Sequence, residues 1–337
     1  NRKAGSPLRP DELAALVRPR LAPWTVSDVP ILDECEELLG PMPSSSSSSR
    51  EADERAIERA REAIEAQNLG GGIVTAQMLA EHVAGQDTWT PLSERAAKDR
   101  KWAYGHIVVD EAQELSPMAW RALLRRCPSR SFTVVGDLDQ RRGSKRPPTW
   151  EKALGPAARA LAAEYALTVS YRTPATLTTL AEGVVARAGV PVLYPMTAVR
   201  DVEDCYRVTH VDAPEDTPAS SKDNSPLWRA VTQAQREAEE RLDREAGTSR
   251  GRIALIVGNE RARAWGADVD GETALSERVS LLSAVASKGL EFDSVILVEP
   301  AEILGDGVGD LFVALTRATH DVHVVHCAPL PAGMEEW

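Results

Sequence analysis

The sequence has few of the features that mark secreted or membrane proteins. Its 337 residues contain only four cysteines, at Cys35, Cys127, Cys205 and Cys327, and none of them has C-x-x-C spacing. This scatter argues against a disulfide framework and against a zinc site. No apolar run approaches the roughly 18 residues that a membrane helix needs, and no signal-peptide pattern opens the chain. We therefore expect a cytoplasmic protein with reduced, mostly buried thiols.

An excess of basic residues is also missing. The chain has 39 Lys and Arg against 51 Asp and Glu, a net charge of −12. Proteins that grip nucleic acid along their length usually show a basic face, because neutralising phosphates dominates their affinity. An acidic balance leaves room for a local basic groove. It nevertheless disfavours tight non-specific DNA binding and is compatible with a protein partner.

Hydrophobic residues make up 43% of the chain and charged residues 27%, as in globular proteins. The length gives room for two domains that can each bury a core. Residues 1–43 have helical patterns, and six serines follow at 44–49. That run is either a natural flexible linker or an engineered or placeholder segment. Further helical patterns span 51–66 and begin again at Thr75.

From Trp102 onward, short apolar runs alternate with helical patterns. The first half predicts strands at 107–109, 132–135 and 167–169, and helices that begin after Ser116, Thr149 and Thr173. We expect the Thr149 helix to continue to about Ala163 and the Thr173 helix to end at Gly189. The second half predicts a long helix over 227–246 and five strands, at 207–211, 253–257, 279–285, 295–298 and 322–325. Such alternation is typical of α/β proteins with parallel, doubly wound sheets.

Polar signatures follow several of these strands. Ile107-Val108-Val109 leads into Asp110-Glu111-Ala112-Gln113, and open α/β sheets place their ligands at this end of a strand. The next strand leads into residues 136–140, Gly-Asp-Leu-Asp-Gln. Three more signatures follow: Ser-Tyr-Arg-Thr-Pro at 170–174, Ser-Lys-Gly-Leu-Glu-Phe-Asp at 287–293 and Val-Ala-Leu-Thr-Arg-Ala at 313–318.

These five signatures, in this order, resemble those of superfamily 1 helicases of the UvrD/Rep type, and the resemblance covers roughly residues 100–327. It implies an α/β fold of two RecA-like (P-loop NTPase) parallel-sheet domains that hydrolyse ATP. On this reading residues 1–43 are the N-terminal helical part of the first lobe, and residues 50–172 are the rest of that lobe. Residues 173–337 are the second lobe.

The resemblance also implies roles for single residues on ATP and Mg²⁺. Asp110 matches the carboxylate that holds the metal, and Glu111 the residue that orients or deprotonates the attacking water. Gln140 matches a γ-phosphate sensor. Arg172 matches an arginine that reaches the γ-phosphate, and Arg317 the arginine finger.

Other residues in the signatures have weaker assignments. Gly289 and Glu291 match positions that contact phosphate and ribose. Lys288 and Asp293 are expected to be structural instead. Three tryptophans, at positions 120, 150 and 265, are expected to pack in the core more often than to stack on nucleobases.

The phosphate-binding signature G-x-x-x-x-G-K-[ST] is missing from all 337 residues. In the resembled family this loop precedes the Asp-Glu signature in the same lobe, so we expect it upstream of Asn1; loss of the loop is the alternative. The first RecA-like domain is therefore expected to be incomplete. Without the loop, the chain alone should bind ATP poorly and hydrolyse none measurably.

The spacing of the signatures and the local sequence indicate which branch of the family the chain resembles. Arg172 and Lys288 are 116 positions apart, which leaves little room for the large inserted domain of DNA-translocating relatives. Residues 114–120 and 125–130 look like the HelD branch of actinobacteria, which acts on RNA polymerase. The expected function is thus part of an ATPase core that dissociates or recycles RNA polymerase. The alternatives are a fragment of a 3′–5′ DNA helicase and a non-enzymatic binding module.

Overall fold

The computed structural model describes residues 9–15, 17–19, 21–40, 58, 99, 102–142, 146–213, 216–222, 225–267 and 277–335. The serine run and the helices expected over 51–66 and after Thr75 lie outside these residues. The chain divides into two compact units, Asn1–Ile107 with Ser116–Ser131, and Val108–Leu115 with Phe132–Trp337. The lobe boundary expected after residue 172 stays a prediction.

The first unit is built around two helices that pack together, α2 (Val29–Leu39) and α6 (Pro117–Arg126). It also contains α1 (Pro10–Ala15) and the 3-10 turn η1 (Val26–Asp28). The predicted start of α6 is confirmed, because the Ser116 hydroxyl accepts a hydrogen bond from the Ala119 amide and Pro117 follows it. Arg125 of α6 pairs with Asp33 and Glu34 of α2.

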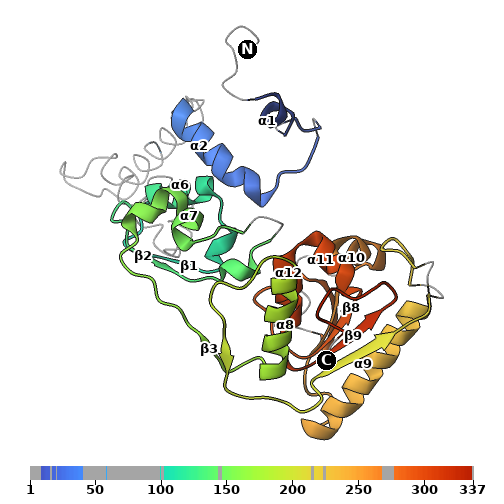
Figure 1. The fold of residues 1–337 in the computed structure, drawn as a ribbon. Helices are drawn as coiled ribbons and strands as arrows, with labels where there is room; N and C mark the ends of the chain where they lie inside the picture. The colour runs from blue at the N-terminus through green and yellow to red at the C-terminus, as the bar shows by residue number, and fades with distance from the viewer. Residues whose placement is uncertain are drawn as a thin grey trace. The chain divides into compact units, whose positions relative to one another are not determined.

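The second unit contains a five-stranded sheet in which every neighbouring pair is parallel (Figure 1). Its strand order is β5-β9-β8-β6-β7. The strands are β5 (Tyr206–His210), β9 (Ala318–His326), β8 (Phe292–Val298), β6 (Ile253–Val257) and β7 (Val279–Ser283). Each overlaps one of the five predicted strands, so the expected α/β class with a parallel sheet is confirmed.

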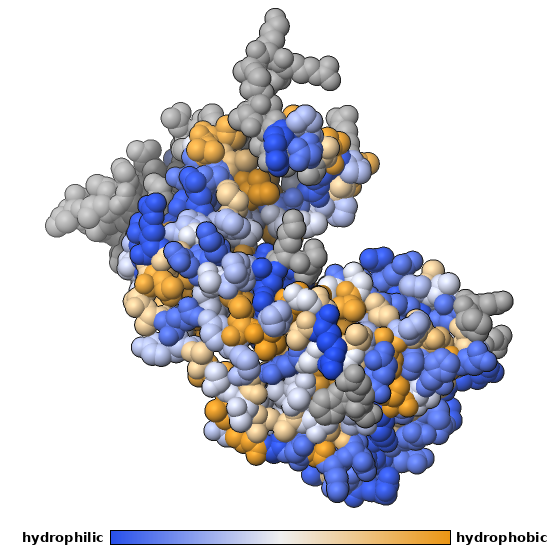
Figure 2. Space-filling view, in the orientation of Figure 1, coloured by the Kyte–Doolittle hydropathy of each residue, from blue (hydrophilic) through white to orange (hydrophobic). Residues whose placement is uncertain are grey.

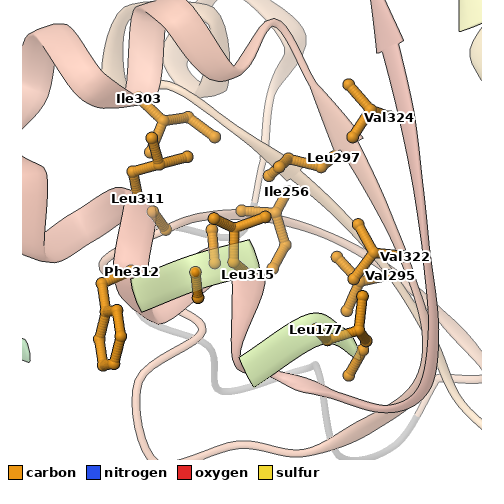
Figure 3. Close-up of a cluster of buried hydrophobic side chains, with 14 of the residues drawn as sticks. Leu177, Ile256, Val295, Leu297, Ile303, Leu311, Phe312, Leu315, Val322 and Val324 are labelled. Carbon is orange, nitrogen blue, oxygen red and sulfur yellow. The ribbon is translucent and has the colours of Figure 1, made fainter. Parts of the chain in front are cut away.

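Helices cover both faces of this sheet, as a doubly wound fold requires. On one face lie α8 (Ala175–Arg187), α11 (Pro300–Asp306) and α12 (Val308–Leu315). Their apolar side chains meet those of β6, β8 and β9 in the core cluster drawn in Figure 3. On the other face, α9 (Pro226–Glu245) and α10 (Asn259–Trp265) pack against Ile253, Leu255 and Ile296.

The opposite faces of α9 explain its charged sequence. Leu227, Val231, Ala234, Ala238 and Leu242 are buried at helical spacing. The hydrophilic remainder faces outward, and the corresponding part of the surface is blue in Figure 2. None of the helices among the described residues is long and apolar enough to cross a membrane.

Two smaller sheets precede the large one in the chain. β1 (Ile107–Val109) pairs with β2 (Phe132–Val134), and β3 (Val169–Ser170) runs parallel to β4 (Thr197–Ala198). Short 3-10 turns follow two of these strands, η2 (Ala112–Glu114) after β1 and η3 (Leu138–Gln140) after β2.

Some predicted boundaries were wrong. The helix capped by Thr149, α7, covers only Trp150–Leu154 and gives way to a 3-10 segment, η4 (Gly155–Ala160). The reason is local: Gly155 has a φ of +52°, which an α-helix cannot contain, and Pro156 after it has no amide to donate. The short helices α10, α11 and α12 were not predicted. For α12 the reason is that it is nearly all buried, so its apolar run lacks a polar face.

Candidate functional site

The end of β1 places the first two candidate residues. Asp110 is exposed, and its Oδ1 accepts a hydrogen bond of 2.8 Å from the Glu111 amide. Glu111 has a left-handed backbone with φ +48° and ψ +39°. That conformation is uncommon outside glycine, costs about 1–3 kcal/mol and is often found at functional sites.

Gln113 connects residues 110–114, here called the Asp-Glu segment, with residues 136–140, the glutamine segment. The buried Gln113 amide donates to Glu111 Oε2 at 2.6 Å, and its carbonyl accepts from the Asp137 amide at 3.0 Å. A Cβ on Gly136 would lie 2.4 Å from Gln113 Oε1, so this approach requires glycine. Gln113 thus holds the Glu111 carboxylate in one orientation.

Gln140 lies in the turn η3, where Asp137 fixes its side chain. Asp137 Oδ2 accepts a hydrogen bond from Gln140 Nε2 at 2.9 Å, and Oδ1 accepts one from the Asp139 amide at 2.9 Å. Burial raises the pKa of the Asp137 carboxyl, although the Gln140 hydrogen bond and nearby cations oppose the shift. Because the Gln140 amino group is engaged by Asp137, its Oε1 is left to face Arg317.

Arg317 follows α12 and is only 2% exposed. Its guanidinium donates to three neutral oxygens: Gln140 Oε1 at 3.1 Å, Val313 O at 3.3 Å and Leu290 O at 3.4 Å. Within the described part of the chain, no carboxylate forms an ion pair with it. A buried cation held only by neutral, rather long hydrogen bonds is energetically expensive in the absence of an anion.

The electrostatics around Arg317 agree with its geometry. Burial, followed by the positive charge of Arg172, lowers the pKa of Arg317 to about 10. Glu111, Glu291 and Asp137 exert smaller opposing effects. The guanidinium therefore stays protonated at neutral pH. Residues from all five signatures are within electrostatic or hydrogen-bonding reach of this one cation.

Arg172 and Glu291, which both act electrostatically on Arg317, form an ion pair with each other. Arg172 Nη1 lies 2.8 Å from Glu291 Oε1, and both side chains are partly or largely exposed. Gly289, two residues earlier, is exposed and has a φ of +73°, which favours glycine. An exposed ion pair of this kind contributes little to stability, about 0–1 kcal/mol.

Lys288 joins the two early segments to the later part of the chain. Its ammonium lies 2.6 Å from Glu114 Oε1, 2.5 Å from the Gln140 carbonyl oxygen and 3.9 Å from Asp310 Oδ1. Its side chain is 8% exposed. These contacts agree with the structural role expected for Lys288. Asp293 is likewise structural, since its Oδ2 accepts a hydrogen bond from the Arg252 amide at 2.7 Å.

Gly309 of α12 makes an equally close contact. A Cβ there would lie 2.1 Å from Arg141 O and 3.1 Å from Asp139 O, so only glycine lets α12 approach η3. Sequence reasoning missed Gln113, Asp137 and Gly309 as contributors to the site. The first two stand beside singled-out residues, but nothing in the sequence marks Gly309.

The tryptophans behave largely as expected. Trp120 is 1% exposed and Trp265 3%, so neither offers a face to a nucleobase. Trp265 packs edge-on against Trp228 at 5.0 Å and donates to Ser220 O. Trp150 is half-buried, and its ring edge lies near Gly136.

The four cysteines are free thiols, as expected, but Cys35 is exposed. Among the described residues, no group of three or more potential ligands could hold a metal ion. Mg²⁺ bound through nucleotide phosphates needs only one or two protein carboxylates. The exposed Asp110 satisfies that requirement.

Comparisons with known proteins give distant similarities to helicases. No protein-family model matches the sequence, and no curated protein does. The chain is similar to an arterivirus nonstructural protein 10 (helicase) solved in complex with DNA, with 17% identity, 66% of this chain and 40% of that chain covered, and a TM-score of 0.35. It thus spans about 40% of that helicase's length.

A second similar structure is the C-terminal domain of a possible DNA helicase from Lactobacillus plantarum. It has 16% identity, 49% of this chain and 92% of that domain covered, and a TM-score of 0.31. The helicase of PRRSV has 15% identity, 65% and 34% coverage, and a TM-score of 0.32.

Proposed function

We propose that this chain carries the C-terminal portion of the nucleotide-hydrolysing core of a helicase-like ATPase. The observation that supports this best is the buried guanidinium of Arg317, which among the described residues donates only to neutral oxygens, Gln140 Oε1 included, and which feels the charge of Arg172. A phosphate group is the anion whose geometry suits converging arginines. Metal-assisted phosphoryl transfer needs this arrangement together with carboxylates for metal and water.

Each candidate residue then has one task on Mg²⁺–ATP. Asp110 holds the metal, and Glu111 orients or deprotonates the attacking water. Gln140 senses the γ-phosphate, and Arg172 and Arg317 stabilise the charge that develops on it.

Two further residues act at the periphery of this site. Gly289 lies next to the phosphates, and Glu291 binds the ribose. When ATP occupies the site, Glu291 exchanges its pairing with Arg172 for the ribose hydroxyls.

The test compares this chain with a form extended toward its N-terminus to include a phosphate-binding loop. We expect ATP hydrolysis only by the extended form, because the amides and lysine of that loop hold the phosphates. Glu111→Gln should abolish hydrolysis while keeping the folded structure, as checked by circular dichroism. An extended form that hydrolyses no ATP with any partner would contradict the proposal and favour a binding module.

For the partner we propose RNA polymerase, which the ATPase would dissociate or recycle. The net charge of −12 and the short spacing between Arg172 and Lys288 support this over DNA translocation. DNA as the track of a 3′–5′ helicase is the alternative. ATPase rates of the extended form should rise with RNA polymerase and change little with single-stranded DNA. Strong stimulation by DNA alone would select the helicase.

A further inference from the structure

A short segment outside the five signatures runs beside the Tyr171–Arg172 signature. β4 pairs in parallel with β3, with Val169 opposite Thr197 and Ser170 opposite Ala198. The pairing is extended at both ends, since the Thr197 amide donates to Thr168 O at 2.7 Å and the Val199 amide to Ser170 O at 3.0 Å. The segment therefore follows the chain up to the residue before Tyr171.

Arg200 continues this pairing with its side chain. Its Nε donates to Tyr171 O at 3.2 Å, and its Nη2 donates to Arg172 O at 2.5 Å. The same Nη2 also donates to the backbone oxygen of Thr319, in β9. One guanidinium thus binds the backbone on which Arg172 is carried and the strand that begins one residue after Arg317.

Neighbouring contacts fix Arg200 itself. Its carbonyl accepts a hydrogen bond from the Ala175 amide at 2.9 Å, at the start of α8. Asp201 accepts from both the amide (3.1 Å) and the hydroxyl (3.0 Å) of Thr176. These bonds supply acceptors to amides in the first turn of α8 and hold the Arg200 backbone in place.

The helices next to the two arginine signatures, α8 and α12, pack together in the core, but the direct hydrogen bond between the signatures is long. Thr173, next to Arg172, donates to Thr316 O at a distance of 3.5 Å. Arg172 and Arg317 carry like charges, and their mutual effect on the Arg317 pKa is unfavourable. A contact to the Arg172 backbone would help to keep the two cations at a fixed spacing. The Arg200 guanidinium can bind several backbone oxygens at once, because it offers five hydrogen-bond donors in one plane.

We propose that Arg200 is a positioning residue that sets the spacing between Arg172 and Arg317 for the phosphate they bind. This inference rests on the proposed function. Arg200 itself binds backbone carbonyls and does not touch the nucleotide. Displacement of a catalytic group by about 1 Å can cost on the order of 10²-fold in rate.

The first experiment measures hydrogen exchange of this chain, which requires no catalysis. In Arg200→Ala we expect faster exchange at the amides of Ala175 and Val199, while amides in the centre of β6 and β8 keep their protection. Arg236→Ala is the matched control, because Arg236 is an exposed arginine on α9. It should leave both sets of amides unchanged.

The second experiment measures ATP hydrolysis by the N-terminally extended form. Arg200→Ala should lower kcat about 10- to 100-fold and change KM less than about threefold, because positioning acts mainly on the transition state. Arg200→Lys keeps one donor group, so its kcat should lie between those of the wild type and Arg200→Ala. Millimolar guanidinium should restore part of the activity of Arg200→Ala.

The outcomes separate the two proposals. Unchanged exchange, or an unchanged kcat in Arg200→Ala of an active extended form, overturns the positioning role. An equal loss of protection throughout the sheet also overturns it, since that would indicate a general stabilising contact. An inactive extended wild type with locally faster exchange in Arg200→Ala overturns the proposed function and the positioning of a phosphate site with it, leaving a local structural contact.

Discussion

At the scale of single residues, the candidate site combines two groups whose charge is unfavourable in the absence of a ligand. Arg317 is a buried cation with neutral partners, and Asp137 is a carboxyl whose pKa is raised by burial. Sites built for binding often sacrifice stability in this way. Replacing such a group should therefore lower activity without an equal loss of stability.

Arg317→Met tests this separation. The free protein should gain about 1 kcal/mol, which raises Tm by about 2–4 °C, because an unpaired buried charge is replaced by a flexible apolar chain. Since the folded pKa of about 10 is below the ordinary value of 12.5, the native cation's cost is complete at neutral pH and declines above about pH 10. Melting curves at pH 7 measure the gain. A lower Tm for Arg317→Met would contradict this account. In the extended form, the same substitution should lower the rate of ATP hydrolysis at least about 10³-fold.

Asp137→Asn tests the orientation of Gln140. The new amide would donate where the carboxylate accepts, so Gln140 should turn its amino group toward Arg317. We expect kcat of the extended form to fall on the order of 10²-fold with little change in Tm. In the wild type, activity should decline as pH falls through the raised Asp137 pKa, whereas the variant should lack this acid limb. A pH–rate profile compares the two, and identical profiles would rule out the assigned role.

At the scale of elements, the site depends on how closely α12 approaches the turn η3. Gly309 permits that approach. Lys288, from the signature at 287–293, binds the same turn through the Gln140 carbonyl oxygen. Because Arg317 follows α12 directly and Gln140 ends η3, any separation of the two elements should pull the guanidinium away from the amide.

Gly309→Ala should therefore be destabilising although alanine favours helices. The added Cβ would lie 2.1 Å from a backbone oxygen, and we expect a loss of about 1–3 kcal/mol, as for other overpacked sites. Gly305→Ala in α11 is the control, since nothing lies within 4 Å of its Cβ. It should be neutral or stabilising by up to about 1 kcal/mol. Urea unfolding measures both, and equal effects would show that α12 has room to move.

At the scale of the whole molecule, Arg172 and Arg317, here called the arginine site, lie inside one compact unit that also contains residues 108–115 and 132–142. The signatures are thus preassembled in this unit, while the phosphate-binding signature is missing from the 337 residues. Weak nucleotide affinity should follow for the chain by itself.

Thermal melting with Mg²⁺–ATP tests that expectation. A ligand at 100 times its Kd stabilises a protein by about 2.7 kcal/mol, so the extended form should melt several degrees higher with saturating ATP. This chain should shift by less than about 1 °C. A large shift in the chain itself would mean that the arginine site binds nucleotide without the loop.

Much of the architecture could be predicted from local pattern. Val and Ile runs fall on the strands of the parallel sheet, and Ser116-Pro117 begins a helix as its capping chemistry requires. The end of the Thr149 helix was mistaken because a single glycine with positive φ outweighed the helical pattern around it. The order of the signatures likewise identified candidate residues, although the last signature lies at the end of helix α12 and not after a strand.

By itself, the sequence determined where the five strands of the large sheet and the helices α6 and α9 lie, because these depend on periodicity and on neighbours along the chain. Only the tertiary structure decided that Arg317 is buried without an anion, that Gly309 touches the backbone of Arg141 and that Arg200 binds two distant backbones. Those facts depend on atoms brought together from more than 25 positions apart, and no local pattern encodes such contacts.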